Sequence, residues 1–477
     1  MPRTSPPDRP HLLALAAIYA GLVSYGSLVP LEFQPLSAPE LRQRLTEVLH
    51  QHLAITSKSD FLVNLLLLAP WSFLLMGALC ADRRRSVALA AAPAVFLACV
   101  TLAAGMEFVQ FFFPPRVSSL HDIVAQSLGC WLGIFLWCTR GQSIVDWCRR
   151  LWQENTVPGL AGMLLPAYAV LLVLLHLAPF DVITRPRELW HKWQGGRIQL
   201  LPFYSPGVYW HKALENGLQN FVYFLPVGLL WGLALRPDMP AQRRVWRVVT
   251  VGLAVCAGIE TLQLVIYSRA FSATDVCTGM LGVLSGAQLV RMEQKPGVTL
   301  TGTHSAAMRL AIAAFVCGLA VCYWRPFDFQ WNLGSALDRL AAVNWLPLAD
   351  YEQQPGFSAV FNITDKTLLF LPLGLLLTLT IPVARQGRSR HVVFLAVFAT
   401  ALLFECGQLF LPTRYFGVTD ILIETFGGWL GCRFAALLVR ATASPAGAGA
   451  CVSAQHAGKS PLVAAPGKRM SMQTGHD

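Results

Sequence analysis

Long apolar stretches separated by short polar gaps make up most of the chain. A helix needs about 20 apolar residues to cross the ~30 Å hydrocarbon core of a bilayer, and twelve stretches approach this length. They lie at residues 11–29, 61–80, 87–111, 123–138, 159–177, 217–235, 248–267, 276–290, 309–323, 367–384, 391–411 and 421–438. This pattern predicts an all-α integral membrane protein with about twelve transmembrane helices. The lipid bilayer is therefore an expected partner of the protein.

Composition and charge support this prediction. The 477 residues are 55% hydrophobic and only 13% charged, with a mean hydropathy of +0.50, whereas a soluble domain has about 25% charged residues. A soluble enzyme, a disordered protein and a secreted disulfide scaffold are therefore excluded. The net charge of +11 comes from short arginine clusters between apolar stretches, a pattern typical of membrane topology. We expect no nucleic-acid partner.

Basic residues are concentrated in alternate gaps, which predicts the orientation. Arginine clusters at 83–85, 236–247 and 385–390 each follow the second helix of a group of four, and further basic residues follow each fourth helix. Because basic loops remain in the cytoplasm, both termini are expected there. Residues 1–10 form the expected cytoplasmic N-terminus, and the Ala/Gly/Ser/Lys-rich segment 441–477 is an expected disordered cytoplasmic tail.

One pattern, Glu-x2-Gln-x5-Arg-x5-Asp-x6-Gly-x3-Gly, occurs three times with identical spacing; we call it the signature. Its polar members are Glu107, Gln110, Arg116 and Asp122, then Glu260, Gln263, Arg269 and Asp275, then Glu405, Gln408, Arg414 and Asp420. Its glycines are Gly129, Gly133, Gly282, Gly286, Gly427 and Gly431. A match at this many fixed positions indicates internal repeats.

The repeats divide the chain into three units of four helices. Unit 1 covers residues 11–140, unit 2 covers 159–291 and unit 3 covers 309–440, with cytoplasmic linkers at 141–158 and 292–308. Each unit has an even number of helices, so all three are expected to point the same way. The predicted fold is thus three parallel four-helix repeats.

The second helix of each unit begins with further polar residues that could join the signature. They are Asp60 and Asn64 in unit 1, Asn216 and Asn220 in unit 2, and Lys366 in unit 3. Unit 3 also carries Glu424 one helical turn after its signature Asp. We therefore expect Lys366 to form an ion pair with Glu424 or Glu405.

The chemistry of the signature allows two interpretations, which the sequence leaves open. Charged groups near hydrocarbon are costly unless paired, so Arg116 is expected to bridge Glu107 and Asp122, with equivalents in the other units. Such a cluster could simply clamp the helices together. Alternatively, it could line an outward-facing pocket that binds phosphate or carboxylate through Arg, and amines or hydroxyls through the carboxylates. The glycines are assigned to helix packing.

No motif indicates a cofactor, a metal or an assigned catalytic residue. The twelve cysteines lie mostly in apolar stretches, with no Cys-x2-Cys pair and no His at ligand spacing. The chain also lacks a phosphate-binding glycine loop and a dinucleotide-binding fingerprint. We therefore expect neither a metal nor a cofactor.

The run Asn-x5-Pro-x-Gly, followed by the signature, resembles the VanZ-like family of small bacterial membrane proteins. The chain resembles three such units fused in tandem. The resemblance implies a bacterial cytoplasmic-membrane protein and an association with tolerance to glycopeptide antibiotics, notably teicoplanin. One departure is that Gln126, Gly279 and Glu424 stand where the family usually has Asn.

These observations favour a cell-envelope factor. Its outward clusters are expected to bind a lipid-linked cell-wall or polysaccharide intermediate, or the drug that targets it. A secondary transporter remains an alternative because of the twelve helices. A membrane enzyme acting on a phospholipid or polyprenyl phosphate, with Glu107 or an equivalent as general base, is another. The sequence does not fix the oligomeric state.

Overall fold

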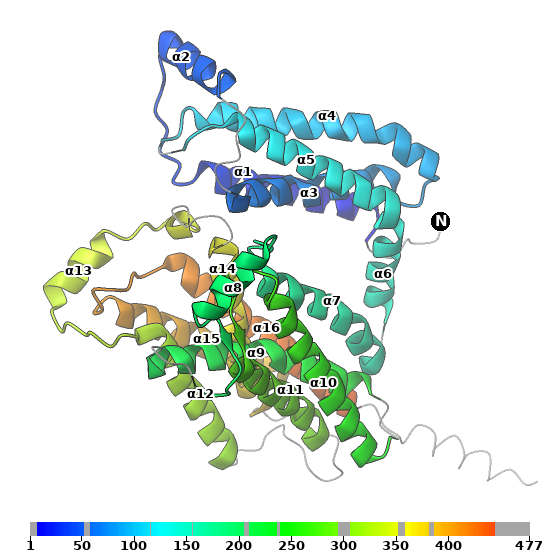
Figure 1. Cartoon of the computed structure of the whole chain (residues 1–477), viewed down its shortest axis with the longest axis vertical. Coiled ribbons are helices and arrows are strands. Elements are labelled where there is room, and N and C mark those ends of the chain that lie inside the picture. The colour runs from blue at the N-terminus through cyan, green and yellow to red at the C-terminus, as the bar shows by residue number, and fades with distance from the viewer. Residues whose placement is uncertain are drawn as a thin grey trace, which may run out of the picture.

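The computed structural model describes residues 7–51, 58–114, 116–154, 156–204, 209–235, 239–293, 306–351, 358–380 and 386–443. The expected disordered tail lies almost entirely outside these ranges, as do Arg236 and Arg385 of the basic gaps. The described part of the chain is almost wholly helical (Figure 1).

Each unit consists of four long helices with a short helix after the first. Unit 1 contains α1 (Arg9–Leu28), α2 (Ala38–Leu49), α3 (Lys58–Cys80), α4 (Arg85–Gln110) and α5 (Leu120–Leu136). Unit 2 contains α7 (Val157–Leu177), α8 (Pro186–Gln194), α9 (Trp210–Ala234), α10 (Ala241–Gln263) and α11 (Ala273–Glu293). Unit 3 contains α12 (Ala306–Trp324), α13 (Leu333–Ala341), α14 (Ser358–Leu379), α15 (Gln386–Gln408) and α16 (Val418–Ala443).

Smaller elements complete the units. A π-helical turn, Trp137–Gly141, continues α5 into α6 (Gln142–Gln153), and a 3-10 turn, Ala349–Tyr351, precedes α14. In unit 2, strand β1 (Ile198–Gln199) pairs in parallel with β2 (Phe271–Ser272), immediately before α11. The sequence did not predict the short helices α2, α8 and α13 or this strand pair.

A long helix coincides with most of each of the twelve predicted stretches, but fewer meet the requirements for a membrane span. Within the described residues, ten helices are long and apolar enough to cross a membrane. Helix α12 supplies only the shorter apolar stretch Met308–Trp324. Helix α16, which carries Asp420 and Glu424, is not among the ten. The chain is therefore a multi-helix membrane protein, and a count of twelve spans stays a prediction.

Within each unit, the second and fourth helices pack at close range through the signature glycines. A Cβ added at Gly129 would lie 1.8 Å from the Leu65 carbonyl oxygen of α3. At Gly282 and Gly427 the same atom would lie 2.2 Å from the Phe221 oxygen and 2.1 Å from the Thr367 oxygen, respectively. Since these contacts are with backbone of the second helix, only glycine permits the approach.

Units 2 and 3 share a hydrophobic core, whereas unit 1 has its own. Leu175 and Val222 of unit 2 pack in one buried cluster with Phe315 and Leu369 of unit 3. The main cluster of unit 1 runs from Leu12 to Val145 and contains unit 1 residues and residues of α6. In Figure 1 the long helices of unit 1 run across the view, while α7, α10 and α11 run obliquely down it. A parallel arrangement that includes unit 1 therefore stays a prediction.

Candidate functional site

The signature Glu makes the same contact in all three units. Its Oε2 accepts a hydrogen bond from the backbone N–H of the residue that immediately precedes the fourth helix, where donors lack intrahelical partners. The distances from Oε2 to the nitrogen are 2.9 Å for Glu107 and Ser119, 3.0 Å for Glu260 and Ser272, and 2.8 Å for Glu405 and Gly417. All three Glu side chains are buried. Each therefore caps the start of the fourth helix.

The signature Arg also has a constant role, but not the expected one. Its guanidinium group donates to backbone carbonyl oxygens at the end of the first helix instead of standing between the Glu and the Asp. The Nε contacts are Arg116 to Val29 at 2.9 Å, Arg269 to Ala178 at 2.7 Å, and Arg414 to Arg325 at 2.9 Å. The predicted bridge is thus replaced by a helix C-cap, which favours positive charge. Burial lowers the pKa of Arg269 and Arg414 in the turns that follow α10 and α15.

The polar residue of the second helix reaches the signature Asp, as expected for the two Asn residues. Asn64 Nδ2 donates to Asp122 Oδ1 at 2.7 Å. Asn220 donates to the backbone carbonyl of Asp275 and, at 3.1 Å, to Thr278 Oγ1.

In unit 3, Lys366 forms its ion pair with Asp420. The predicted partner of Lys366 was Glu424 or Glu405, and this prediction was wrong. Tyr351 also donates its hydroxyl hydrogen to Asp420. Asp420 therefore has two side-chain donors, one of them charged.

The signature Gln has a different hydrogen-bond acceptor in unit 3 than in units 1 and 2. Gln110 Nε2 donates to the Ser27 carbonyl at 3.1 Å and Gln263 Nε2 to the His176 carbonyl at 3.4 Å, so both reach the first helix. Gln408 Nε2 instead donates to Glu405 Oε1 at 3.2 Å. Asp60 of α3 and Asn216 of α9 are both exposed.

A further basic contact recurs in every unit and was not predicted. A basic side chain from each short helix donates to backbone carbonyls at the end of the third helix or just beyond it. The contacts are Arg44 to Phe111 at 2.7 Å, Lys192 to Gln263 at 2.6 Å, and Arg339 to Leu409 at 2.9 Å. Lys192 is 1% exposed, and burial lowers its pKa. The basic residues precede the signature Arg at different distances, so a search at fixed spacing passes over them.

Three signature residues of unit 3, Gln408, Arg414 and Asp420, line a polar cavity. This cavity has a volume of about 1170 Å³. Its wall includes Lys366, Gln408, Arg414, Tyr415 and Asp420 of unit 3, Glu215 and Gln219 of unit 2, and Pro30, Glu32 and Pro114 of unit 1. All three units therefore contribute to it.

Two carboxylates, Glu215 of unit 2 and Asp365 of unit 3, line this cavity and have partners in both units. Glu215 of α9 forms ion pairs with Arg325 at 3.1 Å and with Lys212 at 3.2 Å. Asp365 of α14 accepts hydrogen bonds from Gln219 Nε2 and the Tyr223 hydroxyl of α9, both at 2.7 Å. The cavity thus offers cations for an anionic group and carboxylates for hydroxyl or amine donors.

Glu424 lies outside the cavity wall, next to this cluster. It is 0% exposed, and its carboxylate lies beside the hydroxyl group of Tyr323. Unit 3 therefore holds a buried acidic group where units 1 and 2 have Gln126 and Gly279.

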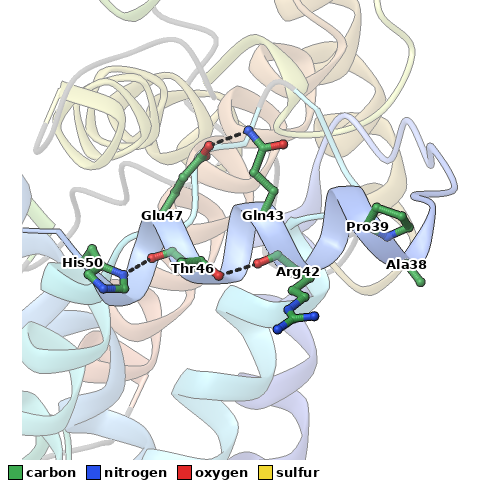
Figure 2. A pocket seen from close by; sticks show the side chains of 7 residues that line it. All are labelled: Ala38, Pro39, Arg42, Gln43, Thr46, Glu47 and His50. Carbon is green, nitrogen blue, oxygen red and sulfur yellow. Dashed lines mark hydrogen bonds between the residues drawn. The ribbon is translucent and has the colours of Figure 1, made fainter.

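A second hollow lies on the surface of α2 and contains no signature residue. Its volume is about 730 Å³, and its lining residues all come from Ala38 to His50. Figure 2 shows Gln43 bonded to Glu47 on one side of the helix and Arg42 pointing to another. These are contacts one turn apart within one helix, so we do not assign a site there.

The described residues contain no group of three or more His, Cys, Asp or Glu side chains that could hold a metal ion. The described cysteines are free thiols. The carboxylate of Glu107, the general base of the enzyme hypothesis, is engaged with the Ser119 N–H.

Comparisons with known proteins identify the repeats. A family model described as VanZ/LLP1 matches the chain three times in tandem, over residues 16–141, 166–293 and 312–439. These matches confirm the resemblance inferred from the signature and the presence of three fused units. Neither the curated proteins nor the solved structures include a match to this chain.

Proposed function

The chain belongs to the VanZ/LLP1 family as three fused units, and on this basis we propose that the polar cavity of unit 3 binds the head group of a lipid-linked cell-envelope intermediate. The intermediate is a polyprenyl phosphate or diphosphate that carries a sugar. The family is associated with glycopeptide resistance, and the drug itself, of the teicoplanin type, is the related candidate ligand. Binding either one would contribute to tolerance.

The single observation that carries this proposal is the Lys366–Asp420 ion pair in the wall of the cavity. A phosphate group entering the cavity can compete with Asp420 for the ammonium group of Lys366. Asp420 would keep the Tyr351 hydroxyl as a donor. After this exchange Lys366 contacts the phosphate and Asp420 contacts Tyr351. Ligand binding therefore leaves no buried charge without a partner.

The remaining wall suits the sugar part of the ligand. Asp365 and Glu215 supply carboxylate oxygens that accept hydrogen bonds from hydroxyl groups. Tyr415, which is 87% exposed, offers an aromatic face at the edge of the cavity.

The cavity belongs to a membrane protein, so a lipid tail can remain in the bilayer while the head group is bound. Basic gaps at the opposite ends of the helices favour an outward-facing orientation for the cavity.

The other two units contribute structure to this arrangement. The signature Glu and Arg form the same helix caps in all three units, so they do not distinguish unit 3. Unit 3 differs in the Lys366–Asp420 ion pair at the cavity wall, and we therefore propose one binding site, in unit 3, and not three equivalent sites.

Binding to the reconstituted full-length protein tests the proposal. The probe is a fluorescent polyprenyl diphosphate that carries the cell-wall disaccharide peptide, with uncharged polyprenol as its control. We expect Lys366→Asn and Tyr415→Ala each to weaken binding about tenfold or more. Arg83→Gln, an exposed basic residue in unit 1, serves as the matched control. Equal binding by all variants would contradict the proposal.

A functional assay addresses the drug. The chain is expressed in a teicoplanin-sensitive bacterium, and the inhibitory concentration is compared between wild type and Tyr415→Ala. Two measurements in proteoliposomes test the alternative hypotheses, both of which require turnover. Solute flux tests the secondary transporter, and phosphate release tests the membrane enzyme.

A further inference from the structure

A separate cavity lies between units 2 and 3, lined by helices of both. Its volume is about 680 Å³, within the usual range for small-molecule sites. Helices α9, α10 and α11 form one side, and α12 and α14 form the other. Its apolar lining includes Phe221, Leu284, Phe315, Pro372 and Leu376.

One part of this cavity is basic. Arg244, near the start of α10, and Arg291, near the end of α11, both line it, together with Ser285 and Gln288 of α11. None of the described lining residues is acidic. An apolar cavity between membrane helices with two arginines at one end matches the shape and charge of an anionic phospholipid.

This cavity is distinct from the polar cavity of unit 3. Arg244 lies sixteen residues before Glu260 on α10, which corresponds to roughly 24 Å along the helix axis. Glu260 caps the signature end of unit 2, so the basic end of this cavity lies near the opposite ends of the helices.

We propose that this cavity binds one anionic phospholipid from the adjacent leaflet. Its phosphate lies between Arg244 and Arg291, and an acyl chain packs against the apolar lining from both units. Because α9, α10 and α11 on one side and α12 and α14 on the other would contact the same molecule, the lipid strengthens the contact between units 2 and 3.

Native mass spectrometry of the delipidated full-length protein tests this inference with phosphatidylglycerol, phosphatidylcholine and soluble glycerol 3-phosphate as probes. We expect wild type to retain phosphatidylglycerol in preference to phosphatidylcholine and to retain no glycerol 3-phosphate. The Arg244→Gln/Arg291→Gln double variant should bind phosphatidylglycerol about tenfold or more weakly. Arg247→Gln, an exposed arginine on the same helix that does not line the cavity, should bind as wild type does.

A second variant tests the apolar part without altering charge. Ala311→Phe places a larger side chain at the cavity wall, and we expect it to lower phosphatidylglycerol retention several-fold. Equal retention of the two phospholipids by wild type would overturn the inference. So would binding of glycerol 3-phosphate at lipid concentrations, or a similar loss in Arg247→Gln.

Discussion

Lys366 of α14 forms an ion pair with Asp420 of α16 at the positions where unit 1 has the Asn64–Asp122 hydrogen bond. An amide donor has been replaced by a charged one without loss of the contact. Unit 3 thereby gains a cation beside its cavity, while Glu424 adds a buried acidic group nearby. The divergence of unit 3 is concentrated where we propose that ligand binds.

A double-mutant cycle on this pair should show strong coupling. We expect Lys366→Asn and Asp420→Asn to have non-additive effects on the free energy of unfolding, with an interaction energy of about 0.5–3 kcal/mol. Thermal unfolding in detergent measures it. A parallel cycle with Lys366→Asn and Glu424→Gln should give a smaller interaction energy. A larger interaction energy with Glu424 than with Asp420 would show that Glu424 is the true partner of Lys366.

Removing the cap formed by Glu260 should destabilise unit 2. In Glu260→Ala the Ser272 N–H loses its acceptor inside the protein, at a cost of about 1–3 kcal/mol. Glu260→Gln keeps an oxygen that can accept this hydrogen bond and should be closer to wild type. The exposed Gln242→Ala on the same helix is the control for thermal unfolding, and equal stability of all three variants would argue against the cap.

Arg269→Ala should destabilise the protein through the first helix of unit 2. The Ala178 and Leu175 carbonyl oxygens, at 2.7 and 3.0 Å from the guanidinium nitrogens, would lose their donor, at a cost of about 1–3 kcal/mol. Arg269→Lys should retain only part of the stability. Its ammonium group keeps the positive charge but lacks the planar set of donors of a guanidinium group. Arg187→Ala, exposed in the same outer segment, is the control. A melting temperature unchanged by Arg269→Ala would show that water replaces the side chain.

Lys192 should contribute a pH-dependent stability. Lys192→Met removes the donor to three carbonyls and should cost about 1–3 kcal/mol at neutral pH. Burial lowers the pKa of Lys192 in the folded protein. Between that pKa and the ordinary lysine value, the unfolded chain binds more protons than the folded one, so stability rises with pH. The advantage of wild type over Lys192→Met should therefore widen across this interval in unfolding experiments. A constant difference would mean that the folded pKa is not lowered.

Orientation can be checked by labelling intact cells with a membrane-impermeant maleimide. In a background without native cysteines, Trp193→Cys should be labelled from outside and Arg84→Cys only after the membrane is opened. The opposite pattern would place the unit 3 cavity on the cytoplasmic side and exclude an external drug as its ligand.

Periodicity and spacing predicted the long helices and the residues that meet. Apolar stretches of sufficient length specify helices directly, and the three-fold repeat predicted the family. Asn64 is expected to join the signature cluster because it lies near the same end of the unit, and in the structure its partner there is Asp122. Gly129 is assigned to helix packing because a small residue every four positions lets two helices approach closely.

Partners that are backbone atoms could not be predicted. The acceptors of Arg269 are carbonyl oxygens, which every residue carries, so no side-chain pattern marks them. Lys366 could reach Glu424 or Asp420, one helical turn apart on α16, and only the packed structure decides between them. Lys192 escaped notice because the outer segments differ in length between units.

The hydrogen bond between Gln219 and Asp365 joins equivalent positions of units 2 and 3. Two identical copies of a single-unit protein would carry the same residue at both positions. In such a homodimer Gln would face Gln or Asp would face Asp, so this complementary pair could not form. In a fused chain this restriction does not apply, because the two positions can change independently. They carry different residues here, so separating units 2 and 3 into identical subunits would lose the Gln219–Asp365 bond.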